Sequence, residues 1–199
     1  YKNKFLPNSK LNFAENLLSK NNKDKAITFV SENGFREERN WHELNLNVSK
    51  ISKFLKSINI KKKDRVAAYM PNTIETVEAF IASSSLGIIW SSCSPDFGVK
   101  GVVERFSQIN PKVLFAADKY FYNGKTINTL ERVPLILKEI PSIEYVVIVN
   151  YPGEKYLKNK HIYKKLKAIK WSELMKKESE KIQFRKFDFE QDLAILYSS

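Results

Sequence analysis

Apolar residues recur along this 199-residue chain as short runs that alternate with helical stripes. The clearest stripe has steps of four, three, four and three residues, which is the period of one helix face: Leu44, Val48, Ile51, Leu55 and Ile58. Asn40 precedes this stripe and Glu43 follows it by three residues, the pattern of a capping box. The sequence therefore predicts an amphipathic helix that begins close to Asn40.

Five short apolar runs predict the strands of a sheet, at residues 65–70, 88–93, 113–117, 145–149 and 192–197. Stretches with helical spacing separate the first four, at residues 72–87, 99–109 and 128–140, the last with Pro134 in its first turns or at a kink. Strands that are almost wholly apolar and alternate with helices are typical of parallel sheets buried on both faces. The sequence therefore predicts an α/β fold, with a mainly parallel sheet flanked by helices.

The connecting segments carry turn signals of different kinds. Residues 26–30 and 36–40 flank Asn33-Gly34, which predicts a β-hairpin. Ser94-Pro95-Asp96 has the pattern of a helix start, with a capping residue, a proline and an acid. Residues 118–126 are predicted to form a polar and aromatic loop. Residues 150–186 are predicted to form a Lys-rich excursion with a short helix near residues 171–177.

The net charge of +12 raises the question of a nucleic-acid partner. Residues 151–186 carry 12 basic and 4 acidic side chains, and clustered lysines can neutralise phosphates. Only six of the 34 basic residues are Arg, however, and no zinc-finger, RRM or KH signature accompanies them. We therefore expect a solvated surface and no nucleic-acid partner, with a non-catalytic basic binding module as an alternative.

The lengths of the apolar runs and the number of cysteines bear on the compartment in which the protein is expected. No run of about 18 uncharged apolar residues is present, so neither a transmembrane helix nor a membrane partner is expected. The single cysteine, Cys93, cannot form an internal disulfide and fits a reducing compartment. Cytoplasmic localisation is therefore expected.

Common cofactor motifs are missing from the sequence. The six glycines never form the G-x-G-x-x-G fingerprint of dinucleotide-binding domains, and Gly124-Lys125-Thr126 lacks the earlier glycine of a Walker A loop. His42, His161 and Cys93 lie too far apart to have the spacing of metal ligands, so no metal site is expected. Composition and spacing alone thus leave the ligand open.

Longer strings go further, because they resemble the adenylate-forming acyl-CoA synthetases and, among them, the acetoacetate–CoA ligase family. The strings are LNFAENLL (11–18), WHEL (41–44), WSSCSPDFGV (90–99), RFSQI (105–109), PKVLFA (111–116) and YNGK (122–125). String 90–99 is the most discriminating, and the resemblance extends to about residue 149. It implies an incomplete part of the large N-terminal domain: a lead-in (1–25), an alternating core (26–149), the Lys-rich excursion (150–186) and a strand leading into the phosphate loop (187–199).

The resemblance implies a reaction for the full-length protein. Acetoacetate, ATP and CoA would give acetoacetyl-CoA, AMP and diphosphate through an acyl-adenylate, with Mg²⁺ accompanying ATP. An acetyl-, propionyl- or other short-chain acyl-CoA synthetase is the alternative. The catalytic and magnesium residues and the C-terminal domain of the family have no counterpart within these 199 residues. This fragment alone is therefore expected to be inactive, with no catalytic residue of its own.

The resemblance also implies two loops that approach CoA. One contains Tyr122, Asn123, Gly124 and Lys125, and the other contains Ser94, Pro95 and Asp96. A cation at 125 suits a CoA phosphate, Gly124 permits close approach, and Tyr122 or Asn123 could contact the adenine or ribose. Pro95 and Asp96 stand where related ligases carry glycines, and this departure favours a helix-capping role for them. Ser198 and Ser199 match the start of the loop that wraps the ATP phosphates.

Overall fold

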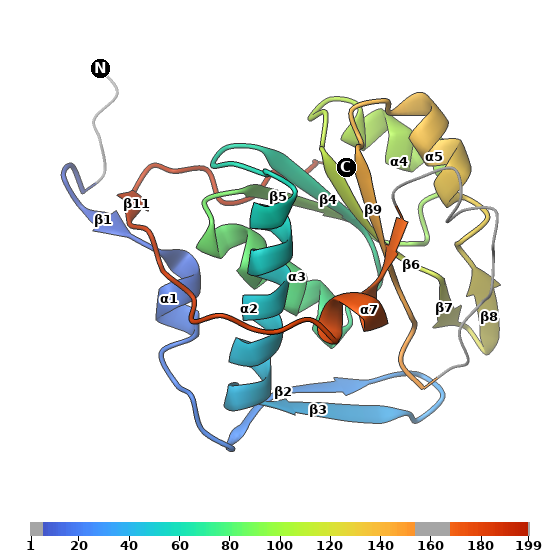
Figure 1. The fold of residues 1–199 in the computed structure, drawn as a ribbon. Helices are drawn as coiled ribbons and strands as arrows, with labels where there is room; N and C mark the ends of the chain where they lie inside the picture. The colour runs from blue at the N-terminus through green and yellow to red at the C-terminus, as the bar shows by residue number, and fades with distance from the viewer. Residues whose placement is uncertain (1–5, 154–167, 199) are drawn as a thin grey trace.

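A five-stranded parallel sheet forms the centre of the computed structural model, which describes residues 6–153 and 168–198 (Figure 1). Its strands lie in the order β10-β9-β6-β4-β5, and every neighbouring pair is parallel. The strands are β4 (Arg65–Tyr69), β5 (Ile89–Cys93), β6 (Val113–Ala117), β9 (Tyr145–Val149) and β10 (Ala168–Lys170). The predicted α/β fold with a mainly parallel sheet is confirmed.

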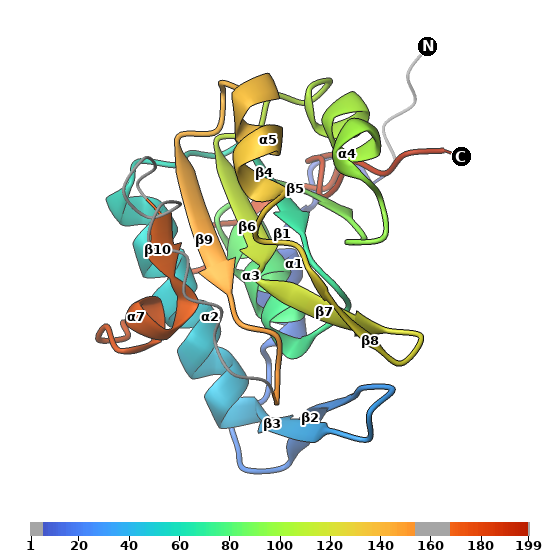
Figure 2. The same cartoon turned by 90° about the vertical axis from the view of Figure 1, so that its right-hand side faces the viewer.

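Helices cover both faces of this sheet (Figures 1 and 2). One face packs against α2 (Trp41–Ser57), α3 (Ile74–Ser85) and α7 (Trp171–Met175), and the other against α4 (Val99–Phe106) and α5 (Val133–Glu139). Along β4, Val66 and Ala68 lie in the first core, whereas Ala67 and Tyr69 lie in the second. All four side chains are fully buried, which explains why this strand has no polar face.

The predicted capping box is confirmed at the start of α2. The Asn40 side chain accepts a hydrogen bond from the Glu43 backbone at 2.8 Å, and the Glu43 carboxylate accepts one from the Asn40 backbone at 3.0 Å. Other helix ends differ from the prediction. Helix α3 is capped by Thr73 rather than by Asn72, α4 ends at Phe106 rather than near residue 109, and α5 starts at Val133 with Pro134 in its first turn.

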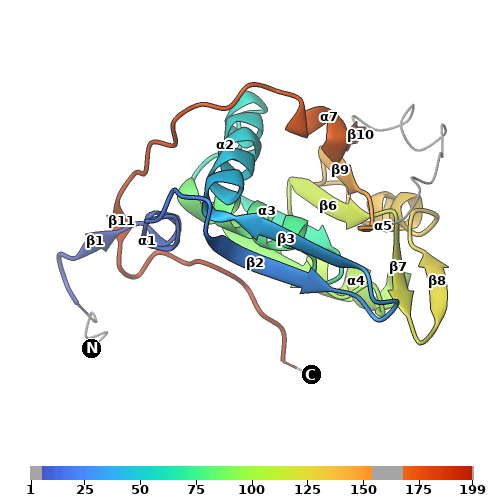
Figure 3. The ribbon, with the colours of Figure 1, turned by 90° about the horizontal axis from the view of Figure 1, so that it is seen from below.

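Two hairpins stand beside the sheet with their tips close together (Figure 3). The predicted hairpin is confirmed as β2 (Lys25–Val30) and β3 (Arg36–Asn40). The loop predicted at residues 118–126 is wrong, because β7 (Lys119–Tyr122) and β8 (Lys125–Asn128) form a second antiparallel hairpin. Asn123 and Gly124 have φ angles of 50° and 72°, as a two-residue hairpin turn with right-handed strand twist requires.

The segment Ser94-Pro95-Asp96 is not the helix start that its sequence predicts. Helix α4 begins at Val99 with Gly98 as its N-cap, and the three residues form a separate turn. The Ser94 hydroxyl donates to the Asp96 carboxylate at 2.7 Å and accepts from the Asp96 backbone N–H at 3.3 Å. Ser94 therefore stabilises a turn through its hydrogen bonds to Asp96, two residues later, and does not cap a helix.

The end of the chain also differs from the prediction. Residues 192–197 form no full strand, because only Ala194 bridges to Trp90 at the edge of β5. Two backbone hydrogen bonds hold this bridge, from Trp90 to Leu193 and from Ile195 to Trp90. A second short pair joins β1 (Lys10–Leu11) to β11 (Phe187–Asp188), and α1 (Phe13–Leu17) packs nearby on α3.

The Lys-rich stretch is only partly described. The short helix predicted near residues 171–177 is confirmed as α7, but β10 before it was not predicted, since three residues give no periodic signal. Most of the lysines that define the stretch, including Lys164, Lys165 and Lys167, lie outside the described residues. Among the helices that are described, none combines the length and apolar character needed to cross a membrane.

A buried ionic cluster connects the first hairpin to α2 and α3. Arg39 on β3 contacts Glu78 at 3.0 Å, Glu37 at 3.1 Å and Glu75 at 4.0 Å, and the Asn47 amide donates to Glu78 at 2.8 Å. Burial raises the pKa of Glu75 and raises that of Glu78 to about 7. Within the described part of the chain, one oxygen of each of these two glutamates has no hydrogen-bond partner. Arg39 is thus the cation that contacts three carboxylates, so acidic groups outnumber basic ones in this cluster.

Candidate functional site

The carboxyl ends of three strands meet at one edge of the sheet. Tyr69 at the end of β4 pairs in register with Cys93 of β5 and with Ala116 of β6. Of the five strands in this sheet, β4 comes first in the sequence, and the next two, β5 and β6, lie on opposite sides of it. In open parallel sheets, ligands bind beyond the carboxyl ends of strands where the strand order reverses in this way. The loops after β4, β5 and β6 therefore form the candidate site.

The residues predicted to contact CoA after β6 form the exposed tip of the β7–β8 hairpin. Tyr122 and Lys125 are paired across the turn made by Asn123 and Gly124. Tyr122 is 54% exposed, and Lys125 is exposed and makes no ion pair with any described residue. A Cβ placed on Gly124 would meet no atom within 4 Å, so the backbone there is open to a ligand. The arrangement brings one cation, one aromatic ring and accessible backbone to the same tip.

A carboxylate from the other hairpin contacts this tip. Glu32, in the turn of the β2–β3 hairpin, accepts a hydrogen bond from the backbone N–H of Asn123 at 2.7 Å. Residues 91 positions apart in the sequence therefore meet where Figure 3 shows the two hairpin tips. The contact demonstrates that the N–H of the Asn123-Gly124 turn points outward and binds an anionic oxygen.

The loop after β5 lies against the same hairpin. Asp96 forms a hydrogen bond with Tyr120 of β7, and burial, followed by this bond, raises the pKa of Tyr120 to about 12. The Tyr69 hydroxyl lies 3.0 Å from the carbonyl oxygens of both Pro95 and Phe97. The structure therefore brings the two predicted CoA loops together. Sequence reasoning missed both tyrosines, although each ends or follows a buried strand, where a hydroxyl can reach the next loop.

Ser198 lies at a neighbouring place, at the end of the segment beside β5. It lines a pocket of about 370 Å³ with five other residues: Glu104, Arg105, Gln108, Leu196 and Tyr197. The segment is fixed by the Ser91 hydroxyl, which donates to the Ile195 carbonyl at 2.9 Å. Ser199 lies outside the described residues. Strands β4 and β5 thus lie between the segment that ends at Ser198 and β6, from which the β7–β8 hairpin continues.

Possible metal ligands and the Cys93 thiol were compared with what metal binding or nucleophilic attack would need. No group of three or more His, Cys, Asp or Glu side chains could hold a metal ion among residues 6–153 and 168–198. Burial raises the pKa of the Cys93 thiol to about 11, which makes it a poor nucleophile at neutral pH. The predicted loops therefore offer charged and hydrogen-bonding groups for a ligand, and the nearby buried thiol is not activated.

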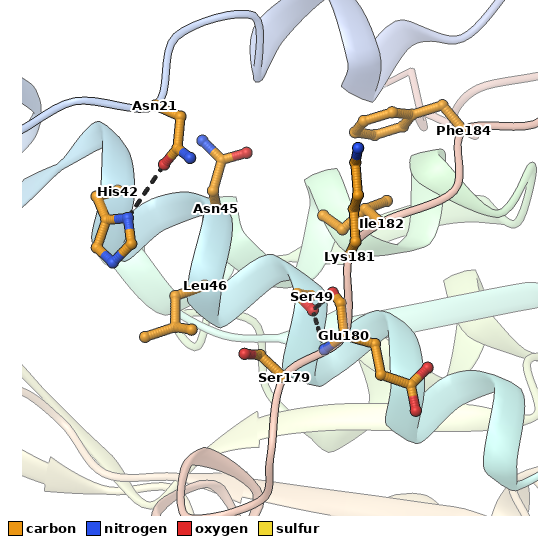
Figure 4. Close-up of a pocket in the computed structure, with 10 residues that line it drawn as sticks. All are labelled: Asn21, His42, Asn45, Leu46, Ser49, Ser179, Glu180, Lys181, Ile182 and Phe184. Carbon is orange, nitrogen blue, oxygen red and sulfur yellow. Dashed lines mark hydrogen bonds between the residues drawn. The ribbon is translucent and has the colours of Figure 1, made fainter.

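A separate pocket of about 330 Å³ lies along α2 (Figure 4). His42, Asn45, Leu46 and Ser49 line one side, and the extended segment 179–184 lines the other. The Ser49 hydroxyl accepts a hydrogen bond from the Glu180 backbone at 2.9 Å, so the segment is fastened to the helix. None of the residues predicted to bind a ligand lines this pocket.

Comparison with known proteins assigns the chain to a family. The family model described as AMP-binding enzyme matches residues 15–199. The chain belongs to this family of AMP-binding enzymes. The match includes both loops of the candidate site and the segment that ends at Ser198. It also disfavours the alternative of a non-catalytic basic binding module.

This AMP-binding chain is similar to curated acetoacetyl-CoA synthetases. It is 42% identical over 151 residues to the one from Mus musculus, covering 74% of this chain and 22% of the relative. It is 38% identical over 200 residues to the one from Xenopus tropicalis, covering 96% of this chain and 29% of the relative. The chain therefore spans between a fifth and a third of the length of these relatives.

A solved structure with a similar fold supports the same relationship. The acetoacetyl-CoA synthetase from Streptomyces lividans matches 98% of this AMP-binding chain and 29% of its own, with a TM-score of 0.86 and 29% identity. The five-stranded sheet with helices on both faces is accordingly part of an N-terminal domain of the acyl-CoA synthetase type.

Proposed function

We propose that the full-length protein ligates acetoacetate to CoA at the expense of ATP, through an acyl-adenylate, releasing AMP and diphosphate. The observation that carries this proposal is the similarity to acetoacetyl-CoA synthetases at 38–42% identity over 74–96% of the chain. Adenylation is chemically required because a free carboxylate resists attack by a thiol. The adenylate supplies a leaving group, and the CoA thiolate then displaces AMP.

The geometry supports a CoA-binding role for the β7–β8 hairpin tip. Lys125 offers an exposed ammonium group to a CoA phosphate, and Gly124 lets the backbone approach it closely. Tyr122 and Asn123 lie where an adenine or ribose could be contacted. Ser94, Pro95 and Asp96 belong to the same site through the bond between Asp96 and Tyr120. Asp96 is an unfavourable neighbour for an anion, so we assign this loop a shaping role more than direct phosphate binding.

ATP and magnesium concern a different part of the site. Ser198 and Ser199 begin the phosphate-binding turn in this proposal, and Arg105 lies in the same pocket as Ser198. The resemblance implies that the protein ligands of the Mg²⁺ ion that accompanies ATP lie elsewhere in the full-length protein. The single buried Cys93 fits a reducing compartment, which agrees with a cytoplasmic enzyme.

Replacing Lys125 by alanine in the full-length protein should raise the KM for CoA roughly tenfold. A charge-assisted contact at an exposed site contributes about 1.5 kcal/mol, and 1.4 kcal/mol corresponds to a tenfold change. Acetoacetate-dependent exchange between ATP and pyrophosphate needs no CoA, and it should stay at the wild-type level. Steady-state thioester formation and exchange, measured on the same preparation, provide the two values.

Lys56→Ala is the matched control, because Lys56 is an exposed lysine in the last turn of α2, near the amino ends of the strands. Dephospho-CoA should discriminate little between wild type and Lys125→Ala if Lys125 contacts the 3′-phosphate. An unchanged KM for CoA together with a loss of exchange would contradict the placement, since Lys125 would then serve ATP or the fold.

A further inference from the structure

We propose that Arg132 is a positioning residue that holds the loop after β5 in the shape required for binding CoA. This inference rests on the proposed function, because it concerns the same site. Arg132 precedes α5 and belongs to neither of the two loops. It acts through Tyr69 and through the backbone of Pro95, and its role is to fix where that backbone lies.

One guanidinium nitrogen of Arg132 contacts both the end of β4 and the loop after β5. Its Nη1 lies 3.0 Å from the Tyr69 hydroxyl and 2.9 Å from the Pro95 carbonyl oxygen. The Tyr69 hydroxyl accepts this bond and donates its own hydrogen to the carbonyl of Pro95 or Phe97, each 3.0 Å away. Tyr69 is fully buried and ends the strand at which the strand order reverses. The network thus fastens the loop after β5 to the carboxyl end of β4.

The same arginine lies next to the hairpin that carries the proposed CoA contacts. A hydrogen bond between Arg132 and Tyr120 contributes to raising the pKa of the arginine, after the larger effect of the Tyr69 bond. Tyr120 in turn bonds Asp96. Arg132, Tyr69, Tyr120 and Asp96 therefore form one polar network in which strand β4, the loop after β5 and strand β7 are all represented.

The place of this arginine in the chain argues against a role in helix formation. Arg132 is the N-cap residue of α5, and its side chain makes no capping hydrogen bond. A cation at a helix N-terminus has an energetic cost because it opposes the helix dipole, and Ser, Thr, Asp or Asn would cap better. Its contacts with Tyr69 and Pro95 offset that cost. Arginine suits this place because it can donate to two acceptors from one rigid group.

The direction of the Pro95 and Phe97 carbonyl groups affects how well the loop after β5 tolerates an anionic ligand. Arg132 and Tyr69 hold the carbonyl oxygens of Pro95 and Phe97, so these acceptors are turned toward the protein. Without the hydrogen bonds from Arg132 and Tyr69, the carbonyl oxygens and the Asp96 carboxylate could turn toward an anionic ligand and repel it. Binding of a phosphate-rich molecule beside this loop therefore depends on Arg132, even if the arginine never touches it.

The test compares Arg132→Met, Arg132→Lys and Tyr69→Phe in the full-length protein, with CoA as the ligand. Arg132→Met should raise the KM for CoA roughly tenfold, because bonds with a charged donor are lost from the loop. Arg132→Lys can restore one of the two bonds, so its KM should be intermediate. ATP–pyrophosphate exchange should remain at the wild-type level in all three. Tyr69→Phe removes only a hydroxyl group, and it keeps the test valid if Arg132→Met does not fold.

Arg36→Met is the matched control, since Arg36 is an exposed arginine whose partner Glu38 lies on the same hairpin. It should change neither value. If Lys125→Ala raises the KM for CoA while Tyr69→Phe and the Arg132 variants do not, Arg132 is structural only and the CoA site stands. A parallel loss of ATP–pyrophosphate exchange, CoA binding and thermal stability in the Arg132 and Tyr69 variants would mean that they damage the fold. That result would also contradict a positioning role for Arg132. If none of the variants, Lys125→Ala included, changes the KM for CoA, both the inference and the proposed CoA site are wrong.

Discussion

Arg39→Met should lower the free energy of unfolding by about 3–5 kcal/mol, the range seen when one partner of a buried ion pair is removed. Arg39 is the cation that faces Glu37, Glu75 and Glu78, and the Glu78 side chain is fully buried. Methionine keeps the length and apolar stem of the arginine but leaves these carboxylates without a counter-charge. The shift in the urea midpoint of the full-length protein, relative to wild type, measures the effect.

Arg36→Met provides the control on the same strand. Arg36 pairs with Glu38 on an exposed surface, where removal of an ion pair costs about 0–1 kcal/mol. The double variant Arg39→Met with Glu78→Gln should recover part of the loss, because one unpaired charge has been removed. The measurement belongs at pH 8, above the pKa of about 7 of Glu78 in the folded wild type, and a loss of less than about 1 kcal/mol for Arg39→Met there would contradict a buried ion pair.

Glu78→Gln should stabilise the protein at pH 8 but not at pH 4.5. The pKa of Glu78 is raised from 4.5 to about 7, mainly by burial, so the folded chain keeps a proton that the unfolded chain releases between these values. The stability that this group contributes is therefore complete below pH 4.5 and is lost as the pH rises through 7. Glutamine retains an acceptor for Arg39 and Asn47, and it carries no charge at any pH.

The expected gain at pH 8 is up to about 3 kcal/mol, since each pKa unit corresponds to about 1.4 kcal/mol. Unfolding measured at pH 4.5, 6, 7 and 8 should show the advantage of Glu78→Gln growing between pH 4.5 and 7 and levelling off above. Glu139→Gln, at an exposed position of α5, is the control for the substitution itself. A Glu78→Gln difference that stays constant between pH 4.5 and 8 would contradict a raised pKa of Glu78.

Much of the fold follows from local patterns in the sequence. The helical stripe of α2 and the uninterrupted apolar strands β4, β6 and β9 each have a strong periodic signal, and all lie where the sequence predicts them. The β7–β8 hairpin was missed although Asn123-Gly124 carries the same turn signal as Asn33-Gly34. The aromatic and lysine residues around it were interpreted as a loop, because the alternation along four-residue strands is too short to recognise.

The site was predictable only in part. The two loops proposed to bind CoA come from the resemblance, and their proximity follows from a parallel sheet whose strands end in register. The contacts that hold the loops could not be predicted. Arg132 lies 37 residues from Pro95 and 63 from Tyr69 in the sequence, and no local pattern reports such a pairing. The turn at Ser94-Pro95-Asp96 was mistaken for a helix start because tertiary hydrogen bonds to Pro95 override its local capping signals.

Competition among carboxylic acids for the full-length protein tests the proposed substrate and reaction together. The purified enzyme receives equal concentrations of acetoacetate, acetate and propionate with ATP, CoA and Mg²⁺, and the acyl-CoA products are separated and quantified by mass spectrometry. We expect acetoacetyl-CoA to form in excess, with one AMP released for each thioester. A predominance of acetyl-CoA or propionyl-CoA, or no AMP-forming reaction with acetoacetate, would contradict it.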